Sequence, residues 1–492
     1  MEEKQWSWEE LIKKQLQKIP QFVNDDIDDF PVRGTRLLSE IYEKSNVAVL
    51  EPSDFKEVEM DDKWIEAMKE ELKMIEKNDT WELVDRPQHK QPIGVKWVYR
   101  TKLNADGYIN KYKARMLLAL IAQKGWKVYH LDVKSAFLNG YLQEEIFVEQ
   151  PEEFQVKGHE EKVYKLKTAL YGLKHGPRAW YSRIDDYLQN LGFINIPGEA
   201  TLYVKMMDTN LIIVSVYVDD LLVIGNEEKL IMEFKAEMLQ VFEMTDLGLI
   251  SFFLGMEVKQ DHGGVFICQK KYAREILKKI RMEDCKNTTT PMNQKEKFSK
   301  DDGIDKVEEH QFRSLIGCLM YLTAIRPDIM FDVSMLSRFM HCASEVHLQA
   351  ANRIVRYIKG TVDYGVKYTH SHNFQLHGYS DSDLGGSIDD MKSTTAVNQA
   401  IWLRRMLADL HMEQKEPTQI LVDNQTTIFI SNNPVFHGRT KHFKIKLSFL
   451  REAQREGEVK LIYCRTEDQG VDVLTKALPK AKFEALRNKL SV

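Results

Sequence analysis

The chain has 492 residues, of which 43% are hydrophobic, and this length predicts about three domains with ordinary hydrophobic cores. The net charge of −5 excludes a protein that is basic as a whole, although a local basic groove is enough to bind nucleic acid. No apolar run is long enough to cross a membrane, and the acidic start MEEKQWSWEE has no apolar signal region, so we expect an intracellular protein without membrane contact. Five widely spaced cysteines without a Cys-x-x-Cys pair indicate reduced thiols.

The first elements in chain order are a helix and a hairpin. Apolar residues at three- and four-residue steps predict a helix over residues 61–77, after a connector at residues 1–60. In residues 96–115, two strand-like runs flank an Asp-Gly turn, which is typical of a β-hairpin. Its alternating basic and aromatic residues suit phosphates and bases. On this feature alone, the favoured interpretation is a solvated amphipathic hairpin.

The most informative segment is LIIVSVYVDDLLVIG, residues 211–225, which follows a predicted strand at 128–133 and a predicted helix at 178–191. Its two apolar runs predict buried strands that flank Asp219 and Asp220. Adjacent carboxylates at a buried turn cost desolvation energy unless a cation compensates them, whereas an exposed turn is the alternative. Asp132 supplies a third carboxylate at the end of the earlier strand. Carboxylates that converge at strand ends bind hard cations such as Mg²⁺.

The rest of the chain is first helical and then alternating. A helix at 227–242 and a hairpin around 262–264 precede an all-helical region at 310–359. Arg353, Arg356 and Lys359 in that region are interpreted as a solvated ridge. Strands then alternate with helices, namely strand 375–381, helix 396–410, strand 418–423, helix 440–455 and strand 459–464. This alternation predicts a partly parallel sheet covered by helices.

Nine motifs occur in the order of a known family. They are WELVDRP, IGVKWVYRTK, DVKSAFLNGYLQEE, LYGLKHGPRAW, YVDDLLVIG, LGMEV, RPDI, NPVFHGRTKHFKI and DVLTK. From about residue 35 onward, the chain therefore resembles the reverse transcriptase and RNase H portion of a copia-type LTR retrotransposon Pol polyprotein. The resemblance implies an α+β fold with fingers and palm at 61–245, thumb and helical connection at 246–365, and a truncated RNase H-like α/β domain at 366–492.

The resemblance also implies an RNA-directed DNA polymerase and its site residues. The partners would be an RNA template, a DNA primer and dNTPs. The cofactor would be Mg²⁺ or alternatively Mn²⁺. The protein would be located in a cytoplasmic particle or the nucleus. Asp132, Asp219 and Asp220 would bind two metal ions for nucleotidyl transfer. The residues implied to contact the nucleotide are Lys102, Lys113, Arg115, Phe137 and His175. Phe137 would exclude a ribose 2′-hydroxyl, with plain core packing as the alternative.

In the RNase H-like region the resemblance implies a second carboxylate site. Its members would be Asp381 at the end of the first strand, Asp423 on a neighbouring strand and Asp472 on the last helix. The region departs from the family pattern where Thr395 runs directly into AVNQAIWLRRML, because the segment that carries the RNase H glutamate is missing there. We therefore expect RNase H activity to be lost.

A second departure lies in the fingers, where Arg115 runs directly into MLLALIAQ and part of the family's finger segment is missing. A decayed element and a gene model that skips damaged sequence both account for the two junctions. The retained Asp132, Asp219 and Asp220 favour a polymerase. The finger junction favours a non-catalytic relic that keeps the fold and weak nucleic-acid binding. An RNase H-like nuclease is the least favoured of the three functions.

Overall fold

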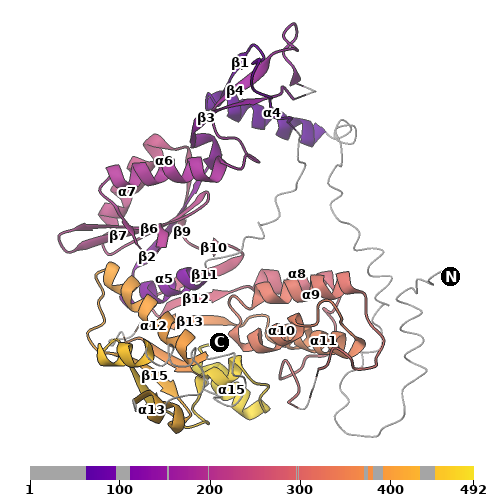
Figure 1. The fold of residues 1–492 in the computed structure, drawn as a ribbon, viewed down its shortest axis with the longest axis vertical. Coiled ribbons are helices and arrows are strands. Elements are labelled where there is room, and N and C mark those ends of the chain that lie inside the picture. The colour runs from indigo at the N-terminus through magenta and orange to yellow at the C-terminus, as the bar shows by residue number, and fades with distance from the viewer. Residues whose placement is uncertain are drawn as a thin grey trace, which may run out of the picture. The chain divides into compact units, whose positions relative to one another are not determined.

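The computed structural model describes residues 62–95, 111–151, 154–197, 199–294, 296, 298–370, 375–380, 392–432 and 449–492 (Figure 1). These residues form two compact units of mixed helix and sheet. The first unit is built from the described parts of Ala48–Gly107 and Trp126–Ile250, and the second from those of Tyr108–Gly125 and Ser251–Val492. Within the described residues, no helix combines the length and the apolar character that a membrane span requires.

A six-stranded antiparallel sheet in the order β5-β6-β7-β8-β2-β9 forms the centre of the first unit. Its strands are β2 (Lys127–Val133), β5 (Ile194–Ile196), β6 (Glu199–Met207), β7 (Asn210–Tyr217), β8 (Asp220–Gly225) and β9 (Met244–Leu249). Helices α6 (Gly176–Asn190) and α7 (Glu228–Val241) share one hydrophobic core with β2, β7 and β8. The strands predicted at 128–133, 211–216 and 221–224 and the helices predicted at 178–191 and 227–242 are confirmed.

The other described elements of the first unit are helix α4, a 3-10 helix and a three-stranded sheet. Helix α4 (Asp62–Lys77) confirms the helix predicted at 61–77. The sheet has the order β1-β4-β3, formed by β1 (Trp81–Val84), β3 (Tyr141–Val148) and β4 (Val163–Thr168). The 3-10 helix η1 (Ala136–Asn139) connects β2 to β3. A Cβ atom at Gly140 would lie 2.5 Å from the backbone nitrogen of Trp180, so only glycine allows this connection to pack directly on α6.

The second unit begins with a sheet of four antiparallel strands in the order β10-β11-β12-β13. They are β10 (Phe252–Phe253), β11 (Met256–Asp261), β12 (Gly264–Cys268) and β13 (Gly365–Thr369), and the β11–β12 pair confirms the hairpin predicted around 262–264. The helices are α8 (Lys270–Lys279), α9 (Glu309–Leu322), η3 (Pro327–Ile329), α10 (Met330–Ser337) and α11 (Glu345–Gly360). The helical region predicted at 310–359 is therefore confirmed.

Helix α5 (Lys111–Lys124) corrects the predicted hairpin at 96–115. Residues 111–115 are helical and not a strand, whereas residues 96–110 lie outside the described residues. The helix contacts β12 and β13 of the second unit. Its residues 117–122 are almost entirely buried, so tertiary packing of this apolar run favours the helix.

The predicted solvated ridge on α11 is also wrong. Arg356 is only 7% exposed, and its Nε donates a hydrogen bond to the carbonyl oxygen of Lys286 at 2.7 Å. Arg353 donates to the Thr290 hydroxyl at 3.1 Å, and Lys359 donates to the carbonyl oxygen of Cys285. These three side chains donate hydrogen bonds to backbone and hydroxyl oxygens of residues 285–290. The ridge therefore holds the segment after α8 against helix α11.

The RPDI motif forms a buried ion pair that joins the helices of the second unit. Two nitrogens of Arg326 donate to the two carboxylate oxygens of Asp328 at 2.9 and 2.8 Å, and the two residues are 2% and 0% exposed. Arg326 also donates to the carbonyl and hydroxyl oxygens of Thr361, and Tyr357 donates to Asp328 at 2.7 Å. The buried charges are therefore paired and hydrogen-bonded, as a stable interior requires.

In the described residues, the predicted strands at the carboxyl end are confirmed as a parallel sheet in the order β14-β15-β16, whereas residues 440–448 of the predicted helix 440–455 lie outside them. Its strands are β14 (His377–Ser380), β15 (Thr418–Val422) and β16 (Val459–Tyr463). Its helices are α12 (Lys392–Asp409), α13 (Gln425–Asn432), a helical turn at 449–455, η4 (Gly470–Leu474) and α15 (Lys480–Lys489). Side chains of η4 and α15 enter the same hydrophobic core as α8 to α11.

Candidate active site

The backbones of three aspartates lie near one another where strand β2 ends and strand β8 begins. Asp132 on β2 lies directly opposite Asp220 on β8 in the antiparallel register. Tyr217 pairs with Asp220 to close the β7–β8 hairpin, so Val218 and Asp219 form a two-residue turn. The backbone N–H of Val133 donates to the carbonyl oxygen of Asp219 at 2.8 Å. The predicted strands are thus neighbours in one sheet, and their register brings the backbones of the three aspartates together.

The turn that carries Asp219 has an unusual backbone. Val218 has a φ of 54°, in the left-handed region that a β-branched residue rarely adopts. The indole N–H of Trp180 on α6 donates to the carbonyl oxygen of Val218 at 2.6 Å. Strain of this kind persists only where surrounding structure fixes it, and it often accompanies functional sites. Trp180 lies within the helix predicted at 178–191, but the sequence gave no signal for this hydrogen bond.

Tyr171 reports the electrostatic environment of the aspartates. Its pKa is raised to about 12, first by partial burial and then by the negative charges of Asp219, Glu71 and Asp132. Burial and the charges of Asp220 and Asp219 also raise the pKa of Tyr217. Both tyrosines stay protonated, first because they are partly buried and then because ionisation would add a negative charge beside existing carboxylates. This end of the sheet therefore favours cations.

Asp220 already has a protein partner. Its Oδ1 is joined to Nε2 of His130 by a hydrogen bond of 2.6 Å. Among the described residues, no three His, Cys, Asp or Glu side chains are arranged as a ready-made metal site. The three aspartates still supply the oxygen donors that Mg²⁺ prefers, so the chemistry of the donor set fits the predicted cofactor. The sequence did not indicate the role of His130.

Of the predicted nucleotide-contacting residues, Phe137 lies beside this site. It belongs to η1, and its ring centroid is 4.8 Å from that of Tyr171. Tyr171 precedes Gly172 in the LYGLK motif, and only the structure identifies it as a neighbour of Phe137. His175 is exposed and precedes α6 as its N-cap residue, without a side-chain capping hydrogen bond.

The three basic nucleotide-contacting candidates are placed differently from the prediction or not at all. Lys113 and Arg115 belong to helix α5 of the second unit, so their expected position on a finger hairpin is wrong. Lys102 lies outside the described residues.

The region predicted to be RNase H-like does not fit a metal site at Asp472. This residue lies in η4 and not on the last helix, which corrects the prediction. It is 1% exposed, and its carboxylate oxygens pair with the ammonium groups of Lys476 at 3.1 Å and Lys482 at 2.7 Å. Asp423 was predicted on a strand and directly follows the end of β15, and Asp381 lies outside the described residues. Asp472 therefore serves the fold through ion pairs.

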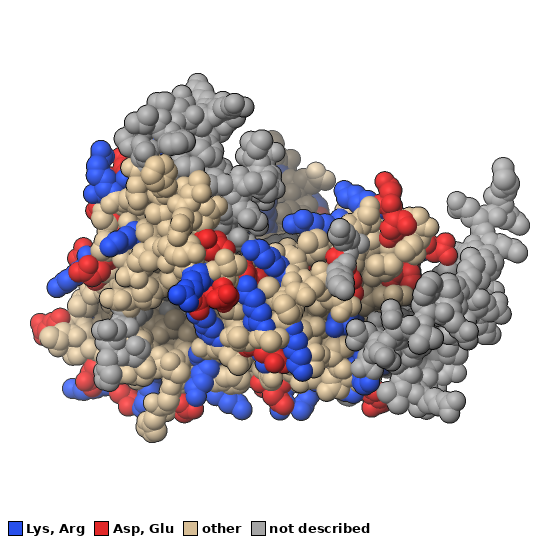
Figure 2. Space-filling view, turned by 90° about the horizontal axis from the view of Figure 1, so that it is seen from below, with Lys and Arg blue, Asp and Glu red and all other residues tan. Residues whose placement is uncertain are grey.

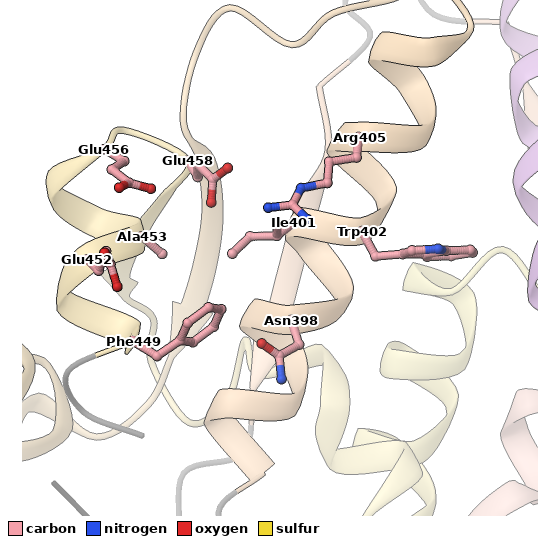
Figure 3. Close-up of a pocket in the computed structure, with 9 residues that line it drawn as sticks. All are labelled: Asn398, Ile401, Trp402, Arg405, Phe449, Glu452, Ala453, Glu456 and Glu458. Carbon is pink, nitrogen blue, oxygen red and sulfur yellow. The ribbon is translucent and has the colours of Figure 1, made fainter. Parts of the chain in front are cut away.

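A pocket of about 430 Å³ lies between α12 and the helical turn at 449–455 of the second unit (Figure 3). Ile401, Trp402 and Phe449 supply its apolar surface. Its polar lining residues are Asn398, Arg405, Glu452, Glu456 and Glu458. None of the predicted site residues lines this pocket.

Comparisons with known proteins support a relationship over most of the chain. The profile of the family described as "Reverse transcriptase (RNA-dependent DNA polymerase)" matches residues 113–294. The chain is 32% identical to the retrovirus-related Pol polyprotein from transposon RE1 of Arabidopsis thaliana, and the match covers 88% of this chain and 34% of that protein. For the corresponding polyprotein from transposon TNT 1-94 of Nicotiana tabacum, the identity is 32% and the coverages are 88% and 38%. The chain thus spans about a third of these plant relatives.

A shorter relative and a solved structure complete the comparison. The chain is 31% identical to the putative transposon Ty5-1 protein YCL074W of Saccharomyces cerevisiae, and the match covers 54% of this chain and 86% of that protein. The solved structure of the foamy viral protease-reverse transcriptase in complex with RNA/DNA hybrid is 12% identical with a TM-score of 0.42. That match covers 74% of this chain and 46% of the viral chain.

Proposed function

Because the chain belongs to the family of retrovirus-related Pol polyproteins from copia-type transposons, we propose that it is an RNA-directed DNA polymerase whose active site lies in the first unit. The observation that carries this proposal is the pairing of Asp132 with Asp220 beside the Val218–Asp219 turn. Strand register brings the backbones of the three aspartates together although Asp132 lies 87 residues before Asp219 in the sequence.

In this proposal, Asp132, Asp219 and Asp220 bind the divalent cations of the reaction. Mg²⁺, when bound, supplies activation of the primer 3′-hydroxyl and neutralises charge on the triphosphate. To bind a cation, Asp220 gives up the hydrogen bond that it shares with His130. Phe137, beside Tyr171, excludes a ribose 2′-hydroxyl and so selects dNTPs.

The proposed partners are an RNA template and a DNA primer, which need a local basic surface. On the face seen in Figure 2, Lys and Arg side chains are interspersed with Asp and Glu, in keeping with the net charge of −5. Helix α8 offers a basic face, because Lys271, Arg274 and Lys278 are exposed at helical spacing. The opposite face of α8 is buried in the hydrophobic core. We assign this basic face to phosphate contacts of the primer-template.

A second candidate function is the non-catalytic relic with weak nucleic-acid binding. The observation that favours it is α5, which packs on β12 and β13 of the second unit and is followed by β2 after only Gly125 and Trp126. This helix occupies the sequence position where the family continues its fingers. A polymerase without that segment closes less completely over the nucleotide.

One experiment distinguishes the two candidates. The full chain is tested for binding of an RNA template annealed to a DNA primer and for primer extension with Mg²⁺ and dNTPs. Extension that is lost in Asp132→Asn supports the polymerase. Binding without extension supports the relic. Absence of both would contradict both candidates.

A further inference from the structure

Trp180 is a buried side chain that the proposed mechanism does not yet use. It is 2% exposed and packs edge-on against Phe242, with ring centroids 5.5 Å apart at an interplanar angle of 89°. Its polar atom points out of this apolar packing, because Nε1–H donates to the carbonyl oxygen of Val218 at 2.6 Å. A buried indole N–H needs such a partner, and here the partner is the turn before the Asp219–Asp220 pair.

The turn needs external support because Val218 holds a φ of 54°. A β-branched side chain in the left-handed region is strained, and without support the turn would relax toward negative φ. Two hydrogen bonds oppose that relaxation: Trp180 donates to the Val218 carbonyl, and the Val133 N–H donates to the Asp219 carbonyl. The carbonyls of both turn residues are therefore held by donors from neighbouring elements.

The same position on α6 also fixes the segment that follows Asp132. A Cβ atom at Gly140 would come within 2.5 Å of the Trp180 nitrogen and 2.6 Å of the Ala179 carbonyl carbon. The backbone that leaves η1, which carries Phe137, is thus packed directly on α6. The side chain of Trp180 contacts the Val218–Asp219 turn, and its backbone lies against Gly140, which follows η1.

We propose that Trp180 is a positioning residue that holds the strained Val218–Asp219 turn, and with it Asp219 and Asp220, in register with Asp132. This inference rests on the proposed polymerase function for its catalytic consequence. The geometric part, that the indole N–H fixes the turn, concerns the protein alone.

The catalytic consequence is tested with Trp180→Phe, which keeps an aromatic ring beside Phe242 and removes only the indole donor. We expect kcat for dNTP incorporation to fall by about tenfold, which corresponds to the loss of one hydrogen bond, with KM for the dNTP unchanged. Trp402→Phe, the same change in the second unit, should retain the wild-type kcat. Equal kcat values for Trp180→Phe and wild type would overturn the inference.

The link to backbone strain is tested by adding Val218→Gly. Glycine adopts a positive φ without steric cost, so the turn no longer depends on the indole. The Trp180→Phe/Val218→Gly double variant should therefore recover part of the kcat that Trp180→Phe loses. A double variant no more active than Trp180→Phe would contradict the proposed role of strain.

The geometric part is tested by hydrogen–deuterium exchange, which does not require activity. The Val133 amide reports the turn because it donates to the Asp219 carbonyl. In Trp180→Phe this amide should exchange faster than in wild type, while amides that pair β6 with β7 keep their rates. Unchanged exchange at Val133, or equal acceleration throughout the sheet, would overturn the inference. If the wild type fails to extend primers, the proposed function fails, and this exchange measurement still decides whether Trp180 positions the turn.

Discussion

Phe137 is the residue whose role is most open to a chemical test. Its ring is partly buried beside Tyr171 and packs against the core of the first unit, so both sugar selection and core packing are compatible with its place. We predict that Phe137→Ala raises the incorporation of ribonucleotides relative to deoxynucleotides by about tenfold, because the phenyl ring would no longer exclude the 2′-hydroxyl sterically. Competitive primer extension with matched dNTP and rNTP measures this ratio. Phe137→Tyr keeps the bulk and should retain discrimination, and an unchanged ratio in an active Phe137→Ala enzyme would remove Phe137 from the site.

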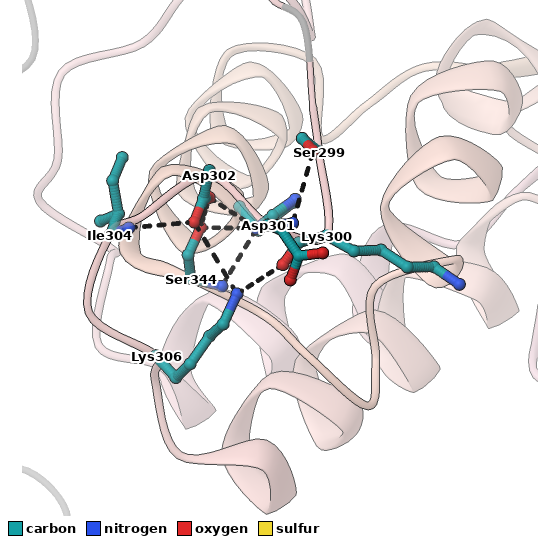
Figure 4. Close-up of polar contacts among 8 residues, drawn as sticks. Ser299, Lys300, Asp301, Asp302, Ile304, Lys306 and Ser344 are labelled. Carbon is teal, nitrogen blue, oxygen red and sulfur yellow. Dashed lines mark hydrogen bonds and ion pairs between the residues drawn. The ribbon is translucent and has the colours of Figure 1, made fainter.

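His347 forms an unusual cap at the start of α11. The backbone N–H of Ser344 donates to Nδ1 of His347 at 3.0 Å. The Ser344 hydroxyl donates to Asp302, which also accepts the Ile304 N–H at 3.1 Å (Figure 4). The cap needs Nδ1 without a proton. His347 is 0% exposed, and burial lowers its pKa below the ordinary 6.5. The neutral ring is therefore part of the folded structure.

This cap predicts a pH dependence of stability. As the pH falls through about 6.5, the unfolded chain binds a proton at His347 while the folded chain does not, so the free energy of unfolding decreases. Above that pH the contribution is complete. We expect a loss of about 1 kcal/mol per pH unit within this window. Urea unfolding at pH 7.5 and 5.5 measures it, and His347→Gln should show a smaller loss. Equal losses for wild type and His347→Gln would contradict the prediction.

At the scale of single elements, the sequence predicted helices α4, α6 and α7 and strands β2, β7 and β8 because their apolar patterns agree with their final packing, whereas strands such as β3 to β6 were not predicted. Strands β7 and β8 are short Val- and Ile-rich runs, and both are buried as expected. Helix α5 was missed at its start because residues 108–115 alternate basic and aromatic side chains as a strand does. Its helical state depends on packing against β12 and β13, two strands that lie far from it in the sequence. Local patterns carry no such information.

Helix α8 leads to a prediction about nucleic-acid binding. Neutralising Lys271, Arg274 and Lys278 together should weaken the binding of primer-template and reduce the dependence of log Kd on log salt, because fewer counterions are released. Fluorescence anisotropy at several salt concentrations measures both effects. The matched control replaces three exposed lysines elsewhere in the second unit, namely Lys415, Lys460 and Lys480. An equal loss in both triple variants would show that only total charge matters and that α8 is not the contact surface.

The segment from β16 to α15 leads to a prediction for the region that the family resemblance assigns to RNase H. Asp472 is held by Lys476 and Lys482 in the folded state, so Asp472→Asn should lower the free energy of unfolding by about 1–3 kcal/mol. The same ion pairs leave this region without a metal-binding Asp472, and we expect cleavage of a labelled RNA–DNA hybrid to be negligible with Mg²⁺ or Mn²⁺. Hybrid cleavage that disappears in Asp423→Asn would contradict this expectation.

At the scale of the whole molecule, only part of the candidate site could be predicted from the sequence. The motif order identified Asp132, Asp219 and Asp220, and strand register pairs the first with the last. The partners of these residues were not predictable, because His130, Tyr171 and Trp180 are chosen by the fold and not by spacing. Likewise, the pairing of Asp472 with two lysines depends on how η4 meets α15.

The most direct test of the account is the rate of DNA synthesis on an RNA template by three proteins. Wild type is compared with Asp219→Asn and with Asp208→Asn, which makes the same change at an exposed residue of the neighbouring β6–β7 turn, where φ is 56°. Primer extension is followed with Mg²⁺ and dNTPs at saturating primer-template. We predict equal rates for wild type and Asp208→Asn, and a rate lower by about a hundredfold or more for Asp219→Asn. Equal rates for wild type and Asp219→Asn, or no extension by a wild type that binds the primer-template, would contradict the account.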